Sequence, residues 1–246
     1  MTPSRNLRSV LESTWFRRFA AFIRRALLGA AAGGVAGIVI GGVGGRLAML
    51  LLRFTSPDSV RGIETDDGFE IGVVTLDTFN LILTTWLLGA VAGLFVALSL
   101  RYLSWSWMPL AWAAPGATIG GAALVSSDGV DFTLLEPTWL AVALFLVIPA
   151  AGLAATALLI RQGEAWWWVR RRRTAAVALA AGPVVALFPV GLVVLAFAMG
   201  WASLIQLAVI ERFNASRLAQ RAAAAAFACV TLGFVPASVS NLQAVF

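Results

Sequence analysis

Few side chains in this sequence could do chemistry, and four of them stand out by type and position. They are one arginine and three carboxylates in or beside long apolar stretches: Arg46, Asp77, Asp131 and Glu136. An arginine inside an apolar stretch and a carboxylate partner could form an intramembrane ion pair or the gate of a transport path. The other interpretation is structural: acids beside helix N-termini complement the helix dipole, and an arginine near a membrane surface extends its side chain to water.

Several other kinds of chemistry are excluded by composition. The chain contains no histidine and a single cysteine, Cys229. Ser–His or Cys–His nucleophile pairs, disulfide frameworks and Cys/His metal sites therefore cannot form. The acidic stretch 64–70 does not have the regular oxygen-ligand spacing of an EF-hand loop. We accordingly expect no catalytic residue, no metal site and no cofactor.

The overall composition indicates a membrane protein. Hydrophobic residues make up 60% of the 246 residues, charged residues make up 12%, and the mean hydropathy is +0.89. Soluble domains contain about 45–50% apolar and about 25% charged residues. Nucleic-acid binding is disfavoured as well, because the arginine clusters adjoin apolar stretches and suit anionic lipid headgroups instead.

Apolar stretches of membrane-spanning length recur along the chain. A helix needs about 20 apolar residues to cross the hydrocarbon core of a bilayer. The pattern predicts an all-α, polytopic transmembrane helical bundle with spans at about 26–52, 78–100, 109–125, 137–160, 174–189, 191–210 and 218–238. The stretch 174–210 is too long for one crossing and has turn residues at Pro189 and Gly191, so we expect seven spans. Six spans are the alternative, with one span in this stretch and an amphipathic segment after it.

The placement of charges predicts the orientation of the spans. Nine of the twelve acidic residues fall in loops 53–77 and 126–136, whereas arginine clusters precede the first span and follow the fourth. Because basic residues are enriched in cytoplasmic loops, we expect a cytoplasmic N-terminus and acidic external loops. A seven-span chain then has an external C-terminus, and a six-span chain has a cytoplasmic one.

The pattern of residues 1–25 predicts a separate amphipathic helix, which precedes a single transmembrane bundle formed by residues 26–246. Apolar side chains share one helical face, and arginines flank it: Arg17, Arg18, Arg24 and Arg25. Such a helix lies in the headgroup layer and binds anionic lipids. A mitochondrial presequence has similar features, but the lysine-free composition rich in arginine, alanine and glycine favours a bacterial plasma membrane.

A repeat of glycines marks the first span. Five of them recur at every fourth residue and so line one groove along the helix: Gly29, Gly33, Gly37, Gly41 and Gly45. The second span carries Gly89 and Gly93, and the third carries Ala113, Ala117 and Gly121. Because no hydrophobic force drives helices together in lipid, small residues that allow close backbone approach determine their packing. We expect packing inside the bundle; an oligomer interface and a narrow pore lining are the alternatives.

Several short runs resemble a group of uncharacterised bacterial multi-pass membrane proteins. They lie within the first 165 residues, at 44–49 (GGRLAM), 55–58 (TSPD), 67–72 (DGFEIG), 131–132 (DF), 135–137 (LEP) and 143–145 (ALF). The resemblance implies a multi-pass topology in a bacterial plasma membrane. It implies no catalytic residue.

These features predict a non-enzymatic integral membrane protein that acts through helix packing with itself or with a partner protein. The alternative is a small cation- or proton-coupled carrier or channel, whose acidic outer mouth concentrates cations. Arg46 and a carboxylate partner would then form its gate. The expected partners are the lipid bilayer, anionic headgroups at the cytoplasmic arginine clusters, and a second copy or another membrane protein. No nucleic-acid partner is expected.

Overall fold

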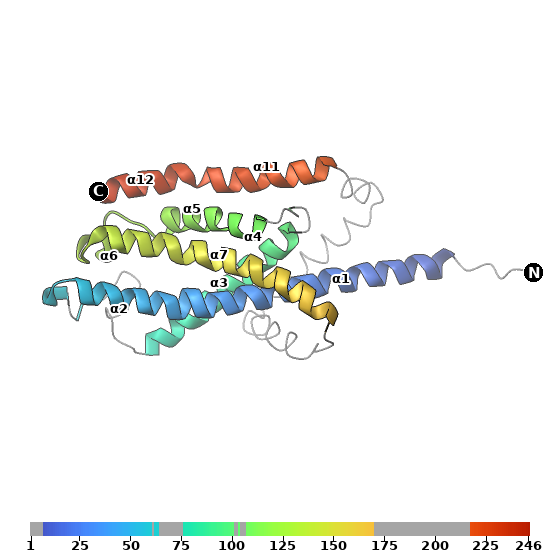
Figure 1. Ribbon diagram of the computed structural model, residues 1–246, viewed down its shortest axis with the longest axis horizontal. Coiled ribbons are helices and arrows are strands. Elements are labelled where there is room, and N and C mark those ends of the chain that lie inside the picture. Colours follow the sequence, from blue (N-terminus) through green and yellow to red (C-terminus); the bar gives the residue numbers. More distant parts are fainter. Residues whose placement is uncertain (1–6, 61, 64–75, 101–102, 104–106, 170–216) are drawn as a thin grey trace, which may run out of the picture.

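The computed structural model describes residues 7–60, 62–63, 76–100, 103, 107–169 and 217–246. Every regular element in these ranges is helical, and the long helices lie side by side along the long axis (Figure 1). Four helices are long and apolar enough to cross a membrane: Ala21–Thr55, Thr78–Ser99, Thr138–Ala165 and Gln220–Val245. Length and composition therefore indicate a membrane protein. The count of seven spans is not established, because the predicted spans 174–189 and 191–210 lie outside the described residues.

The first long helix is a rod of three consecutive elements, α1 (Leu7–Ala36), η1 (Gly37–Gly44) and α2 (Gly45–Thr55). The middle element, η1, is a π-helix, in which backbone hydrogen bonds span five residues instead of four. Half of its residues are glycine, which has little preference for α-helical backbone angles, so the distortion concentrates there.

The rod passes the predicted boundary at residue 25 without a break. No glycine or proline lies between Leu7 and Leu28, so the chain has no residue that would interrupt the helix there. The predicted N-terminal helix and the predicted first span are thus parts of one helix. The interfacial position of the N-terminal part remains a prediction.

The third predicted span, 109–125, is helical but short. It consists of α4 (Met108–Ala111) and α5 (Ala113–Ala123), which span 16 residues together with Trp112 between them. At the usual rise per residue they measure about 24 Å, less than the ~30 Å of a hydrocarbon core. Pro115 has no N–H to bond the carbonyl of Ala111, so the helix is interrupted at Trp112.

The remaining helices run alternately up and down the bundle. α3 (Leu76–Ser99) lies antiparallel to α1, and α7 (Thr138–Val169) lies antiparallel to α5. Two short elements, η2 (Asp58–Val60) and α6 (Val130–Thr133), occupy the connections at one end. The last helix is α11 (Arg217–Gly233) followed by α12 (Val235–Val245), and it extends beyond the predicted end at residue 238.

The last helix runs parallel to α4–α5. Phe227 of α11 stacks edge-on against Trp112 at the start of α5, and Asn241 of α12 reaches Val125 just after its end. The helix therefore starts at the end of the bundle where α7 finishes, and Leu7 and Phe246 lie at opposite ends (Figure 1). A chain that crosses a membrane an odd number of times, as in the seven-span prediction, has its two termini on opposite sides. The six-span alternative places both termini on one side.

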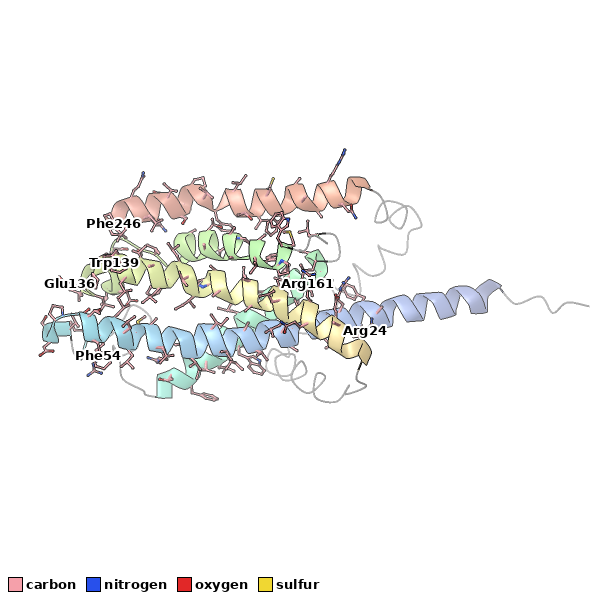
Figure 2. All side chains as sticks on the ribbon, viewed as in Figure 1. Arg24, Phe54, Glu136, Trp139, Arg161 and Phe246 are labelled. Carbon is pink, nitrogen blue, oxygen red and sulfur yellow. The ribbon has the colours of Figure 1, made fainter. Side chains whose placement is uncertain are left out.

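Most charged side chains of the described residues lie at the two ends of the bundle and are sorted by sign, with Arg53 and Glu164 as exceptions. We call one the acidic end (Asp58, Asp128, Asp131, Glu136) and the other the basic end (Arg24, Arg25, Arg161, Arg221). Figure 2 shows Glu136 and Phe246 at the acidic end, and Arg24 and Arg161 at the basic end. A cluster of buried apolar residues lies towards each end, around Leu52 and Leu135 at the acidic end and around Trp112 and Ile160 at the basic end. From Arg25 to Arg53 the rod measures about 40 Å, close to the thickness of a bilayer with its headgroups.

We expect tags before Met1 and after Phe246 to be exposed on opposite sides of the membrane. The reason is the parallel course of α11–α12 and α4–α5, which puts Leu7 and Phe246 at opposite ends of the bundle. The measurement is protection of each tag from a protease in sealed vesicles and after permeabilisation. Cleavage of both tags in sealed vesicles of one orientation would contradict this topology.

Candidate functional site

The closest helix contact in the described bundle joins α1 and α3 through glycines on both sides. A Cβ atom added at Gly33 would overlap the carbonyl oxygen of Gly89 and lie 2.8 Å from the Cα of Gly93. A Cβ atom added at Gly89 would lie 2.9 Å from the Cα of Gly37. Real Cβ contacts are essentially never that short, so only hydrogen fits at these positions and the two backbones touch.

The same contact extends in both directions along the two helices. Towards the basic end a Cβ atom on Gly29 would lie 2.6 Å from Ala97 Cβ, and towards the acidic end one on Gly41 would lie 3.0 Å from Thr85 Cβ. Gly45 differs, because nothing lies within 4 Å of a Cβ atom built there. The close contact with α3 therefore ends between Gly41 and Gly45.

A second glycine contact joins α5 and α7. A Cβ atom at Gly116 would lie 2.7 Å from the Cα of Ala150, and one at Gly120 would lie 2.8 Å from the carbonyl oxygen of Phe145. The small residues predicted to pack on this helix were Ala113, Ala117 and Gly121 instead. The spacing of Gly116 and Gly120 is itself a G-x-x-x-G pair and could have identified the contact.

The last helix is attached to α5 by a polar side chain. The side-chain amide of Asn241 donates to the carbonyl oxygens of Gly121, Ala122 and Val125 at 3.3, 3.2 and 2.9 Å. Carbonyls in the last turn of a helix have no partner within the helix, so Asn241 satisfies groups that would otherwise be orphaned in an apolar setting. Gly121 leaves room beside it for the buried side chain of Ser238.

At the acidic end, the rod is tied to the start of α7. The Ser56 hydroxyl donates to the backbone carbonyl of Glu136 at 3.2 Å and accepts the Glu136 backbone N–H at 2.8 Å. Beneath this pair of bonds lies the apolar cluster of the acidic end, in which the rings of Phe132 and Phe145 are 5.1 Å apart.

The four residues of the predicted ion pair or gate lie on different elements. Arg46 is partly buried in α2, and Asp131 is buried in α6 with 5% of its surface exposed. Glu136 is exposed immediately before α7, and Asp77 is the second residue of α3, with a side chain outside the described residues. Along α2, Arg46 lies about 15 Å from Ser56, whose hydroxyl accepts the Glu136 backbone N–H. The ion pair or gate of these four residues stays a prediction.

The loop between α5 and α6 carries a further carboxylate. The Ser126 hydroxyl donates to the carboxylate of Asp128, and this bond, together with one from a backbone N–H, holds the pKa of Asp128 below its usual range. Asp128 is exposed. Among the described residues, no group of three or more Cys, Asp or Glu side chains is arranged to hold a metal ion.

At the basic end, an ion pair joins α1 to α7. The Arg25 guanidinium binds the Oε1 atom of Glu164 through Nε at 2.8 Å and Nη2 at 2.6 Å. One turn along α1, the side chain of Leu28 rests against Gly163. The sequence pattern predicts Arg25 at the lipid surface and no role for Glu164, because residues 139 positions apart carry no local signal of pairing.

Comparison of the chain with protein-family models, with curated proteins and with solved structures finds no match. The resemblance drawn from short runs of sequence therefore remains a prediction.

Replacing Gly33 by alanine is expected to destabilise the bundle by about 1–3 kcal/mol, because the new methyl group overlaps the α3 backbone. The matched control is Gly45→Ala, where the methyl group meets open space and the better helix former stabilises by up to about 1 kcal/mol. Both are measured by unfolding of the purified protein in mild detergent. Equal stability of the two variants would contradict the contact.

Replacing Asn241 by alanine is expected to cost about 1–3 kcal/mol, because the carbonyl groups at the end of α5 lose their donor. The control is Gln243→Ala, an exposed residue two positions further along α12. Tryptophan fluorescence during denaturation reports the change, since Trp112 contacts Phe227 of the same last helix. An Asn241 variant as stable as the Gln243 variant would show that the amide does not hold α12 in place.

Proposed function

We propose that the chain is a non-enzymatic multi-pass protein of a bacterial plasma membrane, with a cytoplasmic N-terminus, that acts through helix packing with itself or with a partner membrane protein. The observation that supports this function is how little of α11–α12 is covered by the described part of the chain. In the most apolar stretch of this helix 6% of the residues are buried, compared with 44% in the α1–α2 rod. Among the described elements, its contacts are chiefly with α5.

A second copy of the chain is the first partner to expect on the outward surface of α11–α12. Small, exposed residues follow one another there at intervals of three or four: Ala222, Ala226, Cys229, Gly233 and Ala237. Small side chains let two membrane helices approach closely. Two copies inserted in the same orientation are related by an axis along the membrane normal, which turns this surface towards its own counterpart.

The burial of Asp131 supports a second candidate function, a small cation- or proton-coupled carrier. Asp131 has 5% of its surface exposed and precedes Phe132 of the apolar cluster at the acidic end. Buried acidic residues in membrane proteins often mark ion or proton paths. The acidic end would concentrate cations at the entrance. Arg46, in the neighbouring part of the α1–α2 rod, would act as the gate.

The single cysteine provides the test of self-association. Cys229 is exposed on α11, so mild oxidation of native membranes is expected to produce a disulfide-linked dimer. The control carries Cys229→Ser with Val147→Cys, which moves the thiol to an exposed position on α7 and is expected to give no dimer. The product is measured as a doubling of mass on non-reducing gels.

The two candidate functions give different outcomes. Failure of Cys229 to cross-link, together with monomeric mass in lipid nanodiscs, would exclude a second copy as the partner. Cation uptake by proteoliposomes that is abolished in a folded Asp131→Asn variant would favour the carrier over the packing protein. Dimer formation without uptake supports the function proposed first.

A further inference from the structure

Each of the four long apolar helices carries an exposed aromatic side chain at the acidic end of the bundle. Phe54 lies in the last turn of α2, Phe79 and Trp139 lie in the first turns of α3 and α7, and Phe246 directly follows α12. Between 62% and 78% of the surface of each of these side chains is exposed. We call these four residues the aromatic girdle.

The girdle lies where the surface of the bundle changes from apolar to charged. Glu136 is exposed and precedes Trp139 by three residues. Figure 2 shows Phe54, Trp139 and Phe246 together with Glu136 at this end of the bundle. In the other direction along α7 lies Val147, an aliphatic side chain that is also exposed. The girdle therefore separates a polar surface from an apolar one.

The distance from the girdle to the basic end matches the thickness of a bilayer. At the usual rise per residue, α7 measures about 33 Å from Trp139 to Arg161, and the last helix measures about 37 Å from Phe246 to Arg221. The hydrocarbon core of a bilayer is ~30 Å thick, or about 40–45 Å with its headgroups. With the girdle at one boundary of the core, the arginines of two separate helices therefore reach the opposite headgroup layer.

Aromatic side chains are suited to this boundary. The indole group of tryptophan combines an apolar body with one polar N–H group, and such side chains concentrate where lipid tails meet headgroups. An exposed phenylalanine in water leaves a large apolar surface hydrated, whereas among the lipid tails the same surface is removed from water. Interfacial aromatic side chains also determine the depth and tilt of the helices that carry them.

We propose that the aromatic girdle is a lipid-binding surface that holds the acidic end at the boundary between the tails and the ester groups of the phospholipids. The Trp139 indole donates to lipid ester oxygens, and the three phenylalanines lie among the first methylene groups of the tails. Because the four side chains belong to different helices, they determine the depth of the whole bundle. The inference rests on the proposed function, since it requires the chain to lie in a membrane.

The test measures the depth of single nitroxide labels on the full chain in proteoliposomes. Each label is attached to one cysteine in a Cys229→Ser background, introduced by Phe54→Cys, Phe79→Cys, Trp139→Cys or Phe246→Cys, so that three girdle residues remain each time. Depth is obtained from the ratio of collisions with oxygen, which concentrates in lipid, and with a nickel chelate, which stays in water. The four labels are expected at one depth within about 5 Å, the length of one helical turn.

Two positions on α7 or next to it are the matched controls. The label at Val147→Cys is expected about 12 Å deeper than the label at Trp139→Cys, which is two turns away along the same helix. The label at Glu136→Cys is expected outside the girdle, with more nickel collisions than any girdle position. A girdle label as deep as Val147, as open to nickel as Glu136, or shielded from both collision partners would overturn the proposal. The last of these results would place protein instead of lipid over the girdle.

A further variant tests whether the aromatic side chains themselves hold this level. Replacing all four girdle residues by leucine keeps the surface apolar but removes the indole N–H group and the flat rings. The label at Glu136→Cys is then expected to change its depth by about 3 Å, which corresponds to two residues of helix. The control variant, Val39→Leu with Val147→Leu, changes two exposed positions away from the girdle and is expected to leave this depth unchanged. Equal depths in the two variants would overturn the anchoring role.

The label at Val147 separates failure of this inference from failure of the proposed function. Nickel collisions at Val147 as frequent as those at Glu136 would mean that the chain does not lie in a bilayer, which contradicts the proposed function as well. A deep Val147 label combined with girdle labels at unequal depths would overturn the girdle alone.

Discussion

The touching backbones of α1 and α3 are the contact from which the described bundle is organised. Burial of apolar side chains gives helices no reason to associate in lipid, since lipid tails are as apolar as leucine. Stabilisation has to come from close van der Waals contact, and this is strongest where nothing separates two backbones. At Gly33 and Gly89 the helices approach until a single methyl group would no longer fit. The rod and α3 thereby form a unit that presents Leu28 and Ala32 to the rest of the bundle.

The other helices attach to this unit through glycine contacts or through a side-chain hydrogen bond. α7 reaches it through Gly163 and reaches α5 through Gly116, in each case with a glycine on one side and a larger residue on the other. The last helix has few buried residues and relies on one amide that binds three carbonyl oxygens. In an apolar medium a hydrogen bond competes with little water, so one polar side chain can hold a helix that offers little close packing.

Sequence patterns predicted the parts of this arrangement that depend on local spacing. Hydropathy located the long helices, and the repeat through Gly29, Gly33 and Gly37 marked the face of α1 that meets α3. The same repeat was misleading at Gly45, where a Cβ atom would meet nothing within 4 Å, because spacing along one helix does not show where its contact with another helix ends. Pro115 could have warned that the third span is interrupted, since proline removes the hydrogen bond to the carbonyl four residues earlier.

Pairings between distant segments were beyond the reach of these patterns. Asn241 and Val125 are 116 positions apart in the sequence, and such a separation does not predict a contact. Only the folded chain shows that α12 runs parallel to α5. Ser56 and the backbone of Glu136 were likewise predicted only as members of two separate loops. A side chain that caps another helix leaves no periodic signal, because its spacing from its partner depends on every loop between them.

The ion pair at the basic end shows why a contact can be informative without being strong. A partly exposed pair such as Arg25 and Glu164 contributes roughly 0–1 kcal/mol, so it adds little to the stability of a bundle already held by glycine contacts. Its geometry matters more than its energy, because two nitrogens on one oxygen orient the guanidinium group across the α1–α7 contact.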